Sequence, residues 1–278
     1  MEPRRSRPQG VLGCSLTILL LAAVLPCAPA TGKSARAPAV VARLSAEEIV
    51  AKNAAARGGP EAWRNVQTMM WFGHIESTNA TVPGMLFRLA QKRPNKTRFE
   101  INAMGDKSVR VFDGTQGWSL RPAHGRPDVR PYSIDEVRFA QAAPGLDGPL
   151  IDSVAKGSSV SVAGLDEVEK HKAYHLVLKT PSGESQHIWV DAQSFLEIRY
   201  DRPAGSRTVS VLYRDYKPSN GLQIPSIIET GAGAGNTPDR MVIERVALNP
   251  PIDDHAFSEP GAPQQQARKQ LRLGSTPR

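Results

Sequence analysis

The fold is decided by the stretch QTMMWFGHIES (67–77), followed by MLFRLAQK (85–92) and TRFEIN (97–102). Apolar residues in these runs recur at about every second position, which is typical of β-strands and not of helices. Turn-forming residues separate the runs, most clearly Pro94 and Asn95. The stretch therefore predicts three consecutive strands joined by short links.

Nine further runs of the same type follow, at 108–112, 117–120, 159–163, 173–179, 186–190, 196–200, 208–213, 223–229 and 241–248. Most of the links between them are short and rich in Gly, Pro, Asn and Asp. About a dozen strands connected in this way favour one antiparallel meander over alternating β-α-β units.

Two capping boxes mark the helices. Ser45 with Glu48 predicts a helix at 45–57, and Ser133 with Glu136 predicts another that interrupts the meander. Pro60 suits the first position of a short helical turn at 60–63. A second helical stretch is expected at 149–155. The interruption at 133–155 is either an ordinary connection or a lid.

The early strands carry apolar residues on both faces. Met69 and Trp71 share one face of their strand, whereas Met70 and Phe72 share the other. This excess predicts that the helices at 45–57 and 133–155 cover one face of the sheet. The space beneath them is either ordinary core or an apolar cavity with adaptable methionine walls.

Both ends of the chain have a distinct composition. The apolar run 11–25 follows Arg4, Arg5 and Arg7 and precedes Ala28-Pro29-Ala30, so residues 1–30 are expected to be a secretory signal peptide cleaved near Ala30. A lipoprotein signal cut before Cys27 is the rival interpretation. Residues 31–43 are expected to form a flexible leader, 44–258 one domain, and 259–278 a disordered basic tail.

Charge and cysteine content exclude several function classes. The 278-residue chain has a net charge of +8, of which residues 1–30 supply +2 and residues 259–278 supply +3, which leaves +3 for the body. That charge is too small and too scattered for a nucleic-acid-binding surface. Cys14 and Cys27 are the only cysteines. Cleavage near Ala30 would remove both, and with them any disulfide or catalytic thiolate.

No pattern in the chain indicates catalysis or a cofactor. The six histidines show no His-Glu-x-x-His spacing, and no Gly-x-Ser-x-Gly run occurs. His171 and His175 would lie about 13 Å apart on a strand, at about 3.3 Å per residue, which is too far to share one zinc ion. We therefore expect no catalytic residue, no metal and no cofactor.

One turn and one aromatic residue are interpreted as structural. Asp113-Gly114 is expected to form a tight turn with a positive φ at the glycine, and Trp118 is expected to pack its ring over the adjoining strands.

The order of several short motifs resembles the LolA/LolB-like superfamily of outer-membrane lipoprotein-sorting proteins. The matching pieces are LSAEEIVAK (44–52), GGPEAW (58–63), KRPNKTR (92–98), FDGTQGW (112–118), IWVD (188–191), YRDY (213–216) and NGLQIP (220–225). The resemblance implies a mainly β fold, namely a half-open antiparallel β-barrel of about eleven strands with covering helices. It also implies an apolar cavity that takes acyl chains.

From the resemblance we expect a periplasmic, non-enzymatic carrier or sensor that binds a lipid or lipoprotein acyl chain. Inner- or outer-membrane proteins would be its partners, and the protein is expected to be a monomer. The alternative is a periplasmic protein-interaction module without a lipid ligand. We select Met70, Phe72, Leu86 and Phe139 as cavity-wall residues, because they are apolar and placed where a strand face and the helix meet. Strand periodicity leaves open which of the two faces turns inward.

Overall fold

The computed structural model describes residues 44–76, 85–123, 126–232 and 239–261, all of which belong to one compact unit. The predicted signal peptide, the leader and residues 262–278 lie outside these ranges. The described strands are β1 Thr68–Glu76, β2 Met85–Lys92, β3 Lys96–Ala103, β4 Asp106–Phe112, β5 Gly117–Ala123, β6 Arg126–Pro131, β7 Ser159–Val168, β8 His171–Lys179, β9 Ser185–Asp191, β10 Glu197–Ala204, β11 Arg207–Ser219, β12 Leu222–Ala232 and β13 Asp239–Leu248.

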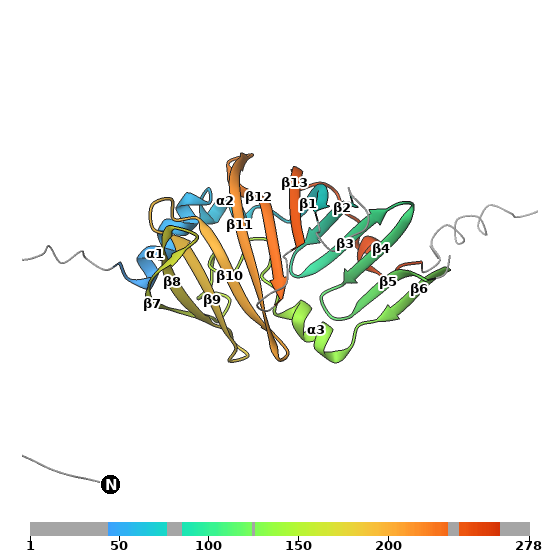
Figure 1. The fold of residues 1–278 in the computed structure, drawn as a ribbon, viewed down its shortest axis with the longest axis horizontal. Coiled ribbons are helices and arrows are strands. Elements are labelled where there is room, and N and C mark those ends of the chain that lie inside the picture. Colours follow the sequence, from blue (N-terminus) through green and yellow to red (C-terminus); the bar gives the residue numbers. More distant parts are fainter. Residues whose placement is uncertain (1–43, 77–84, 124–125, 233–238, 262–278) are drawn as a thin grey trace, which may run out of the picture. The chain divides into compact units, whose positions relative to one another are not determined.

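These strands form a single antiparallel sheet in the order β6-β5-β4-β3-β2-β1-β13-β12-β11-β10-β9-β8-β7. Every pair of neighbours is consecutive in sequence except β1 and β13, whose pairing joins the two halves of the sheet. The edge strands β6 and β7 are also consecutive in sequence. The chain between them, which includes α3 (Ile134–Gln141), must therefore cross from one edge of the sheet to the other (Figure 1).

The predicted half-open antiparallel barrel is confirmed, with thirteen strands in place of about eleven. All twelve predicted runs lie in strands, and the additional one is β6. Its sequence, RPDVRP, contains two prolines and three charged residues, which is why it does not show a strand pattern. Proline is tolerated there because an edge strand has a neighbour on one side only.

The helical predictions are mostly confirmed. α1 (Ala46–Ala56) and α3 each begin with the predicted capping box, and α2 (Pro60–Arg64) begins with Pro60. The predicted helix at 149–155 is wrong, because residues 147–157 form successive turns. Gly148 and Asp152 have φ angles of 78° and 56°, which a right-handed helix does not accept. None of the helices in the described ranges combines the length and apolar character needed to cross a membrane.

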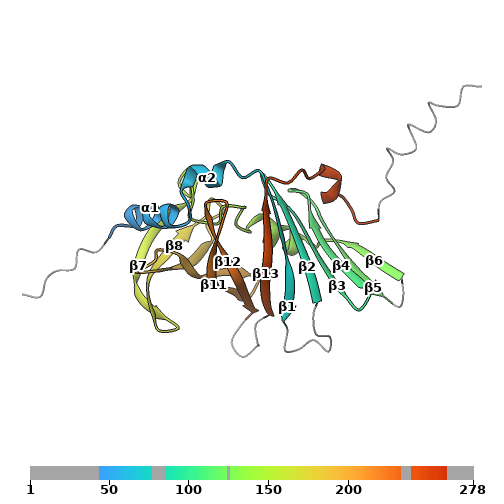
Figure 2. The same ribbon diagram turned by 90° about the horizontal axis from the view of Figure 1, so that it is seen from above.

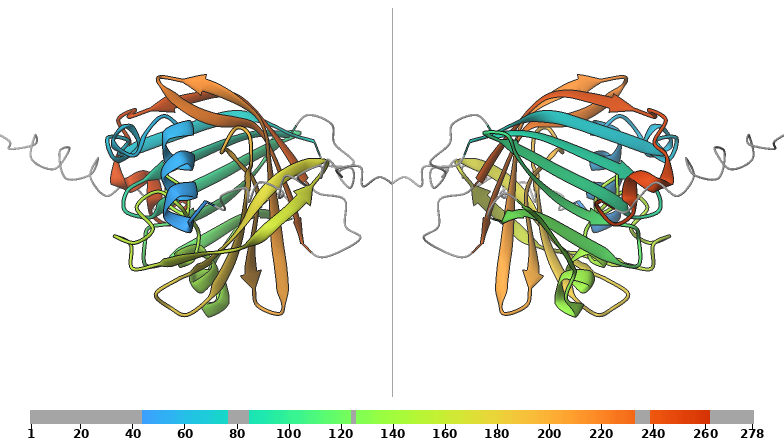
Figure 3. Two further views of the ribbon diagram at one scale, coloured as in Figure 1. Left: turned by 90° about the vertical axis from the view of Figure 1, so that its left-hand side faces the viewer. Right: turned by 90° about the vertical axis from the view of Figure 1, so that its right-hand side faces the viewer.

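The sheet curls, and its two faces are covered differently. Figure 2 shows α1 and α2 over one side of the strands, and Figure 3 shows the strands curling into an incomplete barrel. On the inner face, Ile49 of α1 packs with Leu176 and Ile188, and Trp63 of α2 packs with Met69. On the outer face, the short helix η1 (Asp254–Phe257) packs on β2, β4 and β5 in the cluster Phe257, Ala90, Val109, Val111, Trp118 and Leu120.

The turn after β4 has the structural role expected for it. The Asp113 carboxylate oxygen Oδ1 accepts the N–H groups of Thr115 and Gln116, both at 2.7 Å. Gly114 has a φ of 103°, and a Cβ on Gly117 would lie 2.0 Å from the Tyr132 ring. The turn and the close approach of Tyr132 therefore both depend on glycine.

Trp118→Ala is expected to lower the free energy of unfolding by about 2 kcal/mol. The Trp118 ring packs in the outer cluster but is only partly buried, so the loss is smaller than the roughly 3–5 kcal/mol of a fully buried ring. Urea denaturation followed by circular dichroism measures it. A loss above about 4 kcal/mol would mean that the ring is a central part of the core.

Candidate functional site

A cover on the inner face of the sheet begins with the end of α1. Ser45 and Glu48 fix the start of this helix, with Ser45 Oγ accepting the Glu48 N–H at 3.2 Å and Glu48 Oε2 accepting the Ser45 N–H at 2.7 Å. Gly58 and Gly59, both at positive φ, end the helix and turn the chain into α2. This geometry places Arg57, the C-cap residue that follows α1, between α2 and the sheet.

Arg57 connects four parts of the structure. Its Nη1 donates to the Asp147 carbonyl oxygen at 2.7 Å and lies 3.3 Å from Glu197 Oε1 of β10. Its guanidinium lies over the Trp63 ring at 4.4 Å, and Trp63 Nε1 donates to the Arg57 carbonyl oxygen at 3.0 Å. Arg57 thereby ties α1, α2 and β10 to residues 142–158, which we call the crossing segment.

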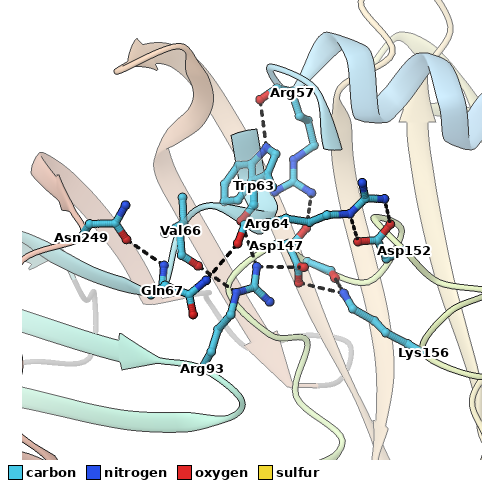
Figure 4. Close-up of polar contacts among 11 residues, drawn as sticks. Arg57, Trp63, Arg64, Val66, Gln67, Arg93, Asp147, Asp152, Lys156 and Asn249 are labelled. Atoms are coloured by element: carbon cyan, nitrogen blue, oxygen red, sulfur yellow. Dashed lines mark hydrogen bonds and ion pairs between the residues drawn. The ribbon is translucent and has the colours of Figure 1, made fainter. Parts of the chain in front are cut away.

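Further ion pairs hold the crossing segment (Figure 4). The Asp147 carboxylate is 2% exposed and accepts from Arg93 Nη2 at 3.1 Å and from Lys156 Nζ at 2.8 Å. Arg64 of α2 forms a bidentate pair with Asp152, at 2.8 and 2.5 Å. A buried carboxylate without such partners would be strongly destabilising, so these contacts determine where the segment lies.

An apolar pocket of about 170 Å³ lies beneath this cover. It is lined by Arg57, Trp63, Trp71, Leu89, Gln91, Pro144, Gly145, Leu146, Gly148, Glu197, Tyr213, Tyr216, Pro225, Ile228 and Met241. The strand residues come from six neighbouring strands, β2 to β10 in sheet order, which would span about 24 Å in a flat sheet. Such residues can line one small pocket only where the sheet is concave.

A second cavity, of about 670 Å³, lies on the other side of residues 144–148. Its walls are α3, the crossing segment and the β8–β9 hairpin, contributed by Arg138, Gln141, Ala142, Ala143, Pro144, Gly145, Gly148, Pro149, Lys156, Ser158, Leu178, Thr180, Pro181, Ser182, Glu184 and Gln186. Pro144, Gly145 and Gly148 line both spaces. Residues 144–148 thus form the partition between the pocket and the larger cavity.

The helix α3 rests on the sheet without a buried side chain. Ile134 is 73% exposed, and no residue of the helix is buried. Three side chains instead donate to carbonyl oxygens at its C-terminal end. Arg202 Nη1 reaches Phe139 at 3.0 Å, Asn95 Nδ2 reaches Ala140 at 3.4 Å, and Gln186 Nε2 reaches Ala142 at 3.5 Å. Polar contacts from both halves of the sheet therefore position α3.

Burial determines the charge state of several groups below the cover. Burial raises the pKa of Glu197, although the Arg57 charge opposes the rise. Burial also raises the pKa of Tyr200, Tyr213 and Tyr216, so their hydroxyls stay protonated. The Tyr216 hydroxyl donates to the Glu197 carbonyl oxygen at 2.9 Å. The pocket is therefore lined by apolar side chains together with the uncharged phenol groups of Tyr213 and Tyr216.

The structure separates the four wall residues selected from the sequence. Met70, Phe72 and Leu86 lie on the outer face of the sheet, opposite the pocket. Met70 packs in the outer cluster with Phe257, Phe72 lies 3.8 Å below the Arg245 guanidinium, and Leu86 is 59% exposed. Phe139 lies on α3, where the Arg202 guanidinium stacks on its ring at 3.6 Å. None of the four lines the 170 Å³ pocket, and ligand contact by them stays a prediction.

The residues on the opposite face of the same strands line the pocket. Trp71 and Leu89 are paired across β1 and β2 and face the cover. The sequence pattern identified both faces but contained no signal that distinguishes them. It also missed Arg57, Glu197 and Asp147. The position of Arg57 before Gly58-Gly59 was the one local signal, because it places a cation at a helix end. The partners of Arg57 are 90 and 140 residues away.

A histidine pair lies on the outer face, away from the pocket. His175 Nε2 and His187 Nδ1 are 2.8 Å apart, and His175 Nδ1 lies 3.1 Å from Asp166 Oδ2. The His175 ring stacks on Trp189, with ring centroids 4.4 Å apart. Across the described ranges, no group of three or more His, Cys, Asp and Glu side chains is arranged to hold a metal ion.

The histidine pair is expected to make stability fall in mild acid. Burial lowers the pKa of His175 below that of an unfolded histidine, so the unfolded chain binds more protons as the pH drops below about 6.5. Urea denaturation of wild type and His175→Gln at pH 7.5 and pH 5.5 tests this. Wild type should lose more stability than the variant over this range, and equal losses would contradict the assignment.

Comparison with known proteins finds similar folds but no matching sequence family. No family model matches the chain, and no curated protein matches its sequence. Solved structures share its fold, among them the following three. A LolA superfamily protein from Nitrosomonas europaea is 13% identical over 78% of this chain and 99% of its own, with a TM-score of 0.51. A DUF1329 family protein from Desulfovibrio piger is 14% identical over 77% and 97%, with a TM-score of 0.50. An outer membrane lipoprotein-sorting protein domain from Vibrio parahaemolyticus is 11% identical over 76% and 95%, with a TM-score of 0.51.

At these identities the likeness concerns the fold. It confirms that the chain has the LolA-like open barrel that the motifs predicted.

Proposed function

We propose that this protein is a periplasmic, non-enzymatic carrier or sensor that binds a lipid or lipoprotein acyl chain on the concave face of its sheet. The observation that carries the proposal is the apolar pocket lined by six strands and closed by a cover held through polar contacts. The LolA-like fold, shared with a lipoprotein-sorting domain, supports it. Partners in the inner or outer membrane would deliver and receive the cargo.

The walls of the pocket suit an alkyl chain. Trp71, Leu89, Ile228 and Met241 offer apolar surface, and Met241 can adapt its side chain to an irregular ligand. Transfer of about a dozen CH₂ groups from water gains up to about 10 kcal/mol, at about 0.8 kcal/mol per group. Micromolar affinity would remain after a sizeable cost for ordering the chain.

Binding requires the partition to move. The pocket of about 170 Å³ is smaller than typical ligand sites of about 300–1,000 Å³, whereas the cavity beyond residues 144–148 falls within that range. Leu150 and Ile151 are buried in the core and anchor the far end of the crossing segment. We therefore place the moving part at α3 and residues 142–148, with Gly148, at positive φ, as the hinge.

Opening of this kind needs no reacting group. Release of the Arg57 contact with Asp147, and of the three side chains that hold α3, exposes the pocket to its neighbour cavity. An acyl chain then replaces the contacts of Leu146 with the inner cluster. The ligand favours the open state because it contacts only that state.

The test is titration of the delipidated mature protein with a fluorescent C16 fatty-acyl probe. Two variants of one strand form a matched pair, because Leu89 faces the pocket and Leu86 faces solvent. Wild type and Leu86→Asp are expected to bind with similar micromolar affinity, and Leu89→Asp to bind at least about tenfold more weakly. Circular dichroism confirms that each variant is folded.

Two outcomes contradict the proposal. Loss of binding in Leu86→Asp but not in Leu89→Asp would place the ligand on the outer face. Absence of saturable binding by wild type, together with absence of lipid in organic extracts of protein purified from its native periplasm, would favour the interaction-module alternative.

A further inference from the structure

An arginine on the inner face of β10 has no carboxylate partner. Arg202 Nη1 donates to the Phe139 carbonyl oxygen at 3.0 Å, and the guanidinium stacks on the Phe139 ring. Among the described residues, no carboxylate lies within ion-pair distance of it. Arg199, on the outer face of the same strand, forms a bidentate pair with Asp201 at 2.9 and 2.6 Å. Burial lowers the pKa of Arg202 and the charge of Glu184 opposes this, but no ion pair in the described part of the chain neutralises the partly buried guanidinium.

A buried hydroxyl lies beside this arginine. Tyr200 is two residues away on the same strand, so both side chains point to the same face about 6.6 Å apart along the strand. Tyr200 is 1% exposed, and its hydroxyl has no hydrogen-bond partner within the described part of the chain. Leaving a buried hydroxyl unpaired is unfavourable, so this group is available for a further acceptor.

A second phenol belongs to the same group. Burial raises the pKa of Tyr200 and of Tyr213, and in both cases the charge of Arg202 opposes the rise. Tyr200 pairs with Val211 of β11, so Tyr213 lies two positions along that strand on the same face, on the side of Tyr200 away from Arg202. All three groups are hydrogen-bond donors at neutral pH, and one of them carries a positive charge.

The three residues run along the inner face in the order Tyr213, Tyr200, Arg202, from the pocket toward the larger cavity. Tyr213 lines the apolar pocket. The pairing of Asp201 with His187 sets Arg202 beside Gln186, which lines the larger cavity. A ligand with its chain in the pocket and its polar end in the cavity would therefore pass Arg202 at the junction.

We infer that Arg202 and Tyr200 form a subsite for the oxyanion headgroup, a carboxylate or a phosphate, of an amphiphile whose alkyl chain occupies the pocket lined by Tyr213. The inference rests on the proposed function, because it assigns the polar end of the same ligand. An oxyanion would accept charge-assisted hydrogen bonds from the guanidinium and the free Tyr200 hydroxyl. A planar guanidinium matches carboxylate and phosphate geometry better than an ammonium does.

The experiment measures displacement of the fluorescent C16 probe at pH 7.5 by hexadecanoic acid, hexadecyl phosphate and hexadecanol. These competitors share a chain length and differ in headgroup. Wild type is expected to bind the two anions at least about tenfold more tightly than the alcohol. Arg202→Met is expected to lose this preference, which is measured as the ratio of anion affinity to alcohol affinity, because loosening of α3 through the lost contact with Phe139 would change all three affinities alike.

Three controls make the result specific. Arg199→Met removes a paired cation from the outer face of the same strand and should leave the preference unchanged. Tyr200→Phe removes one donor without touching the Arg202 contact with α3, and should reduce the preference several-fold while leaving thermal stability unchanged or higher. Acetate and inorganic phosphate are added alone, and displacement by them at the same concentrations would indicate a free-anion site in place of a headgroup subsite.

The outcomes separate the two proposals. Equal displacement by all three competitors, in wild type and in Arg202→Met alike, would overturn the headgroup subsite and leave the acyl-chain carrier intact. Absence of probe binding, with no change in intrinsic tryptophan fluorescence on adding hexadecyl phosphate, would overturn both.

Discussion

Gly73→Ala is expected to lower the free energy of unfolding by about 3 kcal/mol, at the upper end of the usual cost of overpacking. A Cβ on Gly73 would lie 1.9 Å from the Val242 carbonyl oxygen and 2.9 Å from the Phe87 ring. The first of these atoms belongs to the backbone of the neighbouring strand, so it cannot rotate away. The β-bulge between Phe72 and Gly73 lies at the same place.

The location makes this change more damaging than an average clash. The pairing of β1 with β13 is the one contact between sequence-distant neighbours in the described sheet, and it joins the two halves. Separating these strands would weaken the junction around which the concave face is built. Urea denaturation measures the loss.

Gly164→Ala provides the matched control. Gly164 also lies at a β-bulge, but a Cβ there would meet no atom within 4 Å. Its stability should change by less than about 0.5 kcal/mol, as for a substitution at an unconstrained surface position. If both variants lost the same amount, the general cost of adding a side chain at a bulge would explain the result, and the contact with Val242 would not.

Local sequence patterns predicted the elements well because their causes are local. The capping boxes at Ser45 and Ser133 join residues three positions apart, and both formed as expected. Strand periodicity is also local, and each of the twelve runs became part of a strand. β6 failed this test because Pro127 and Pro131 interrupt its alternation, and its edge position makes them easier to accommodate. That position depends on the whole sheet.

The site was harder to predict because it depends on contacts between distant residues. Periodicity assigned Trp71 and Phe72 to opposite faces without showing which face was concave. The decision comes from α1, α2 and the crossing segment, which cover the side of Trp71. The same applies to Arg202, whose lack of a carboxylate partner is a property of the folded chain. A sequence pattern reports which residues alternate, and only the fold determines what they face.

Arg57→Met is expected to destabilise the protein by about 3–5 kcal/mol, the usual cost of removing one partner from a buried ion pair. The change leaves Glu197 buried without its cation, and it removes the donor to the Asp147 carbonyl oxygen. The contact of the guanidinium with the Trp63 ring is also lost. Methionine fills a similar volume, so the effect measures charge and hydrogen bonding more than packing. Urea denaturation at pH 7.5 gives the value.

The companion variant and the pH dependence identify the cause. Glu197→Gln in the Arg57→Met background removes the unpaired carboxylate charge and should recover about 2 kcal/mol of stability.

Because burial raises the pKa of Glu197, the folded state holds its proton more tightly than the unfolded state does. Stability linked to this group is therefore complete in acid, below the unfolded carboxyl pKa of about 4.3, and is lost as the pH rises toward the raised folded value. Without Arg57 only the charge of Lys156 opposes that rise, so Arg57→Met should be less destabilising at pH 5 than at pH 7.5. Equal destabilisation at both pH values, with no recovery in the double variant, would mean that Arg57 acts through Asp147 and Trp63 alone.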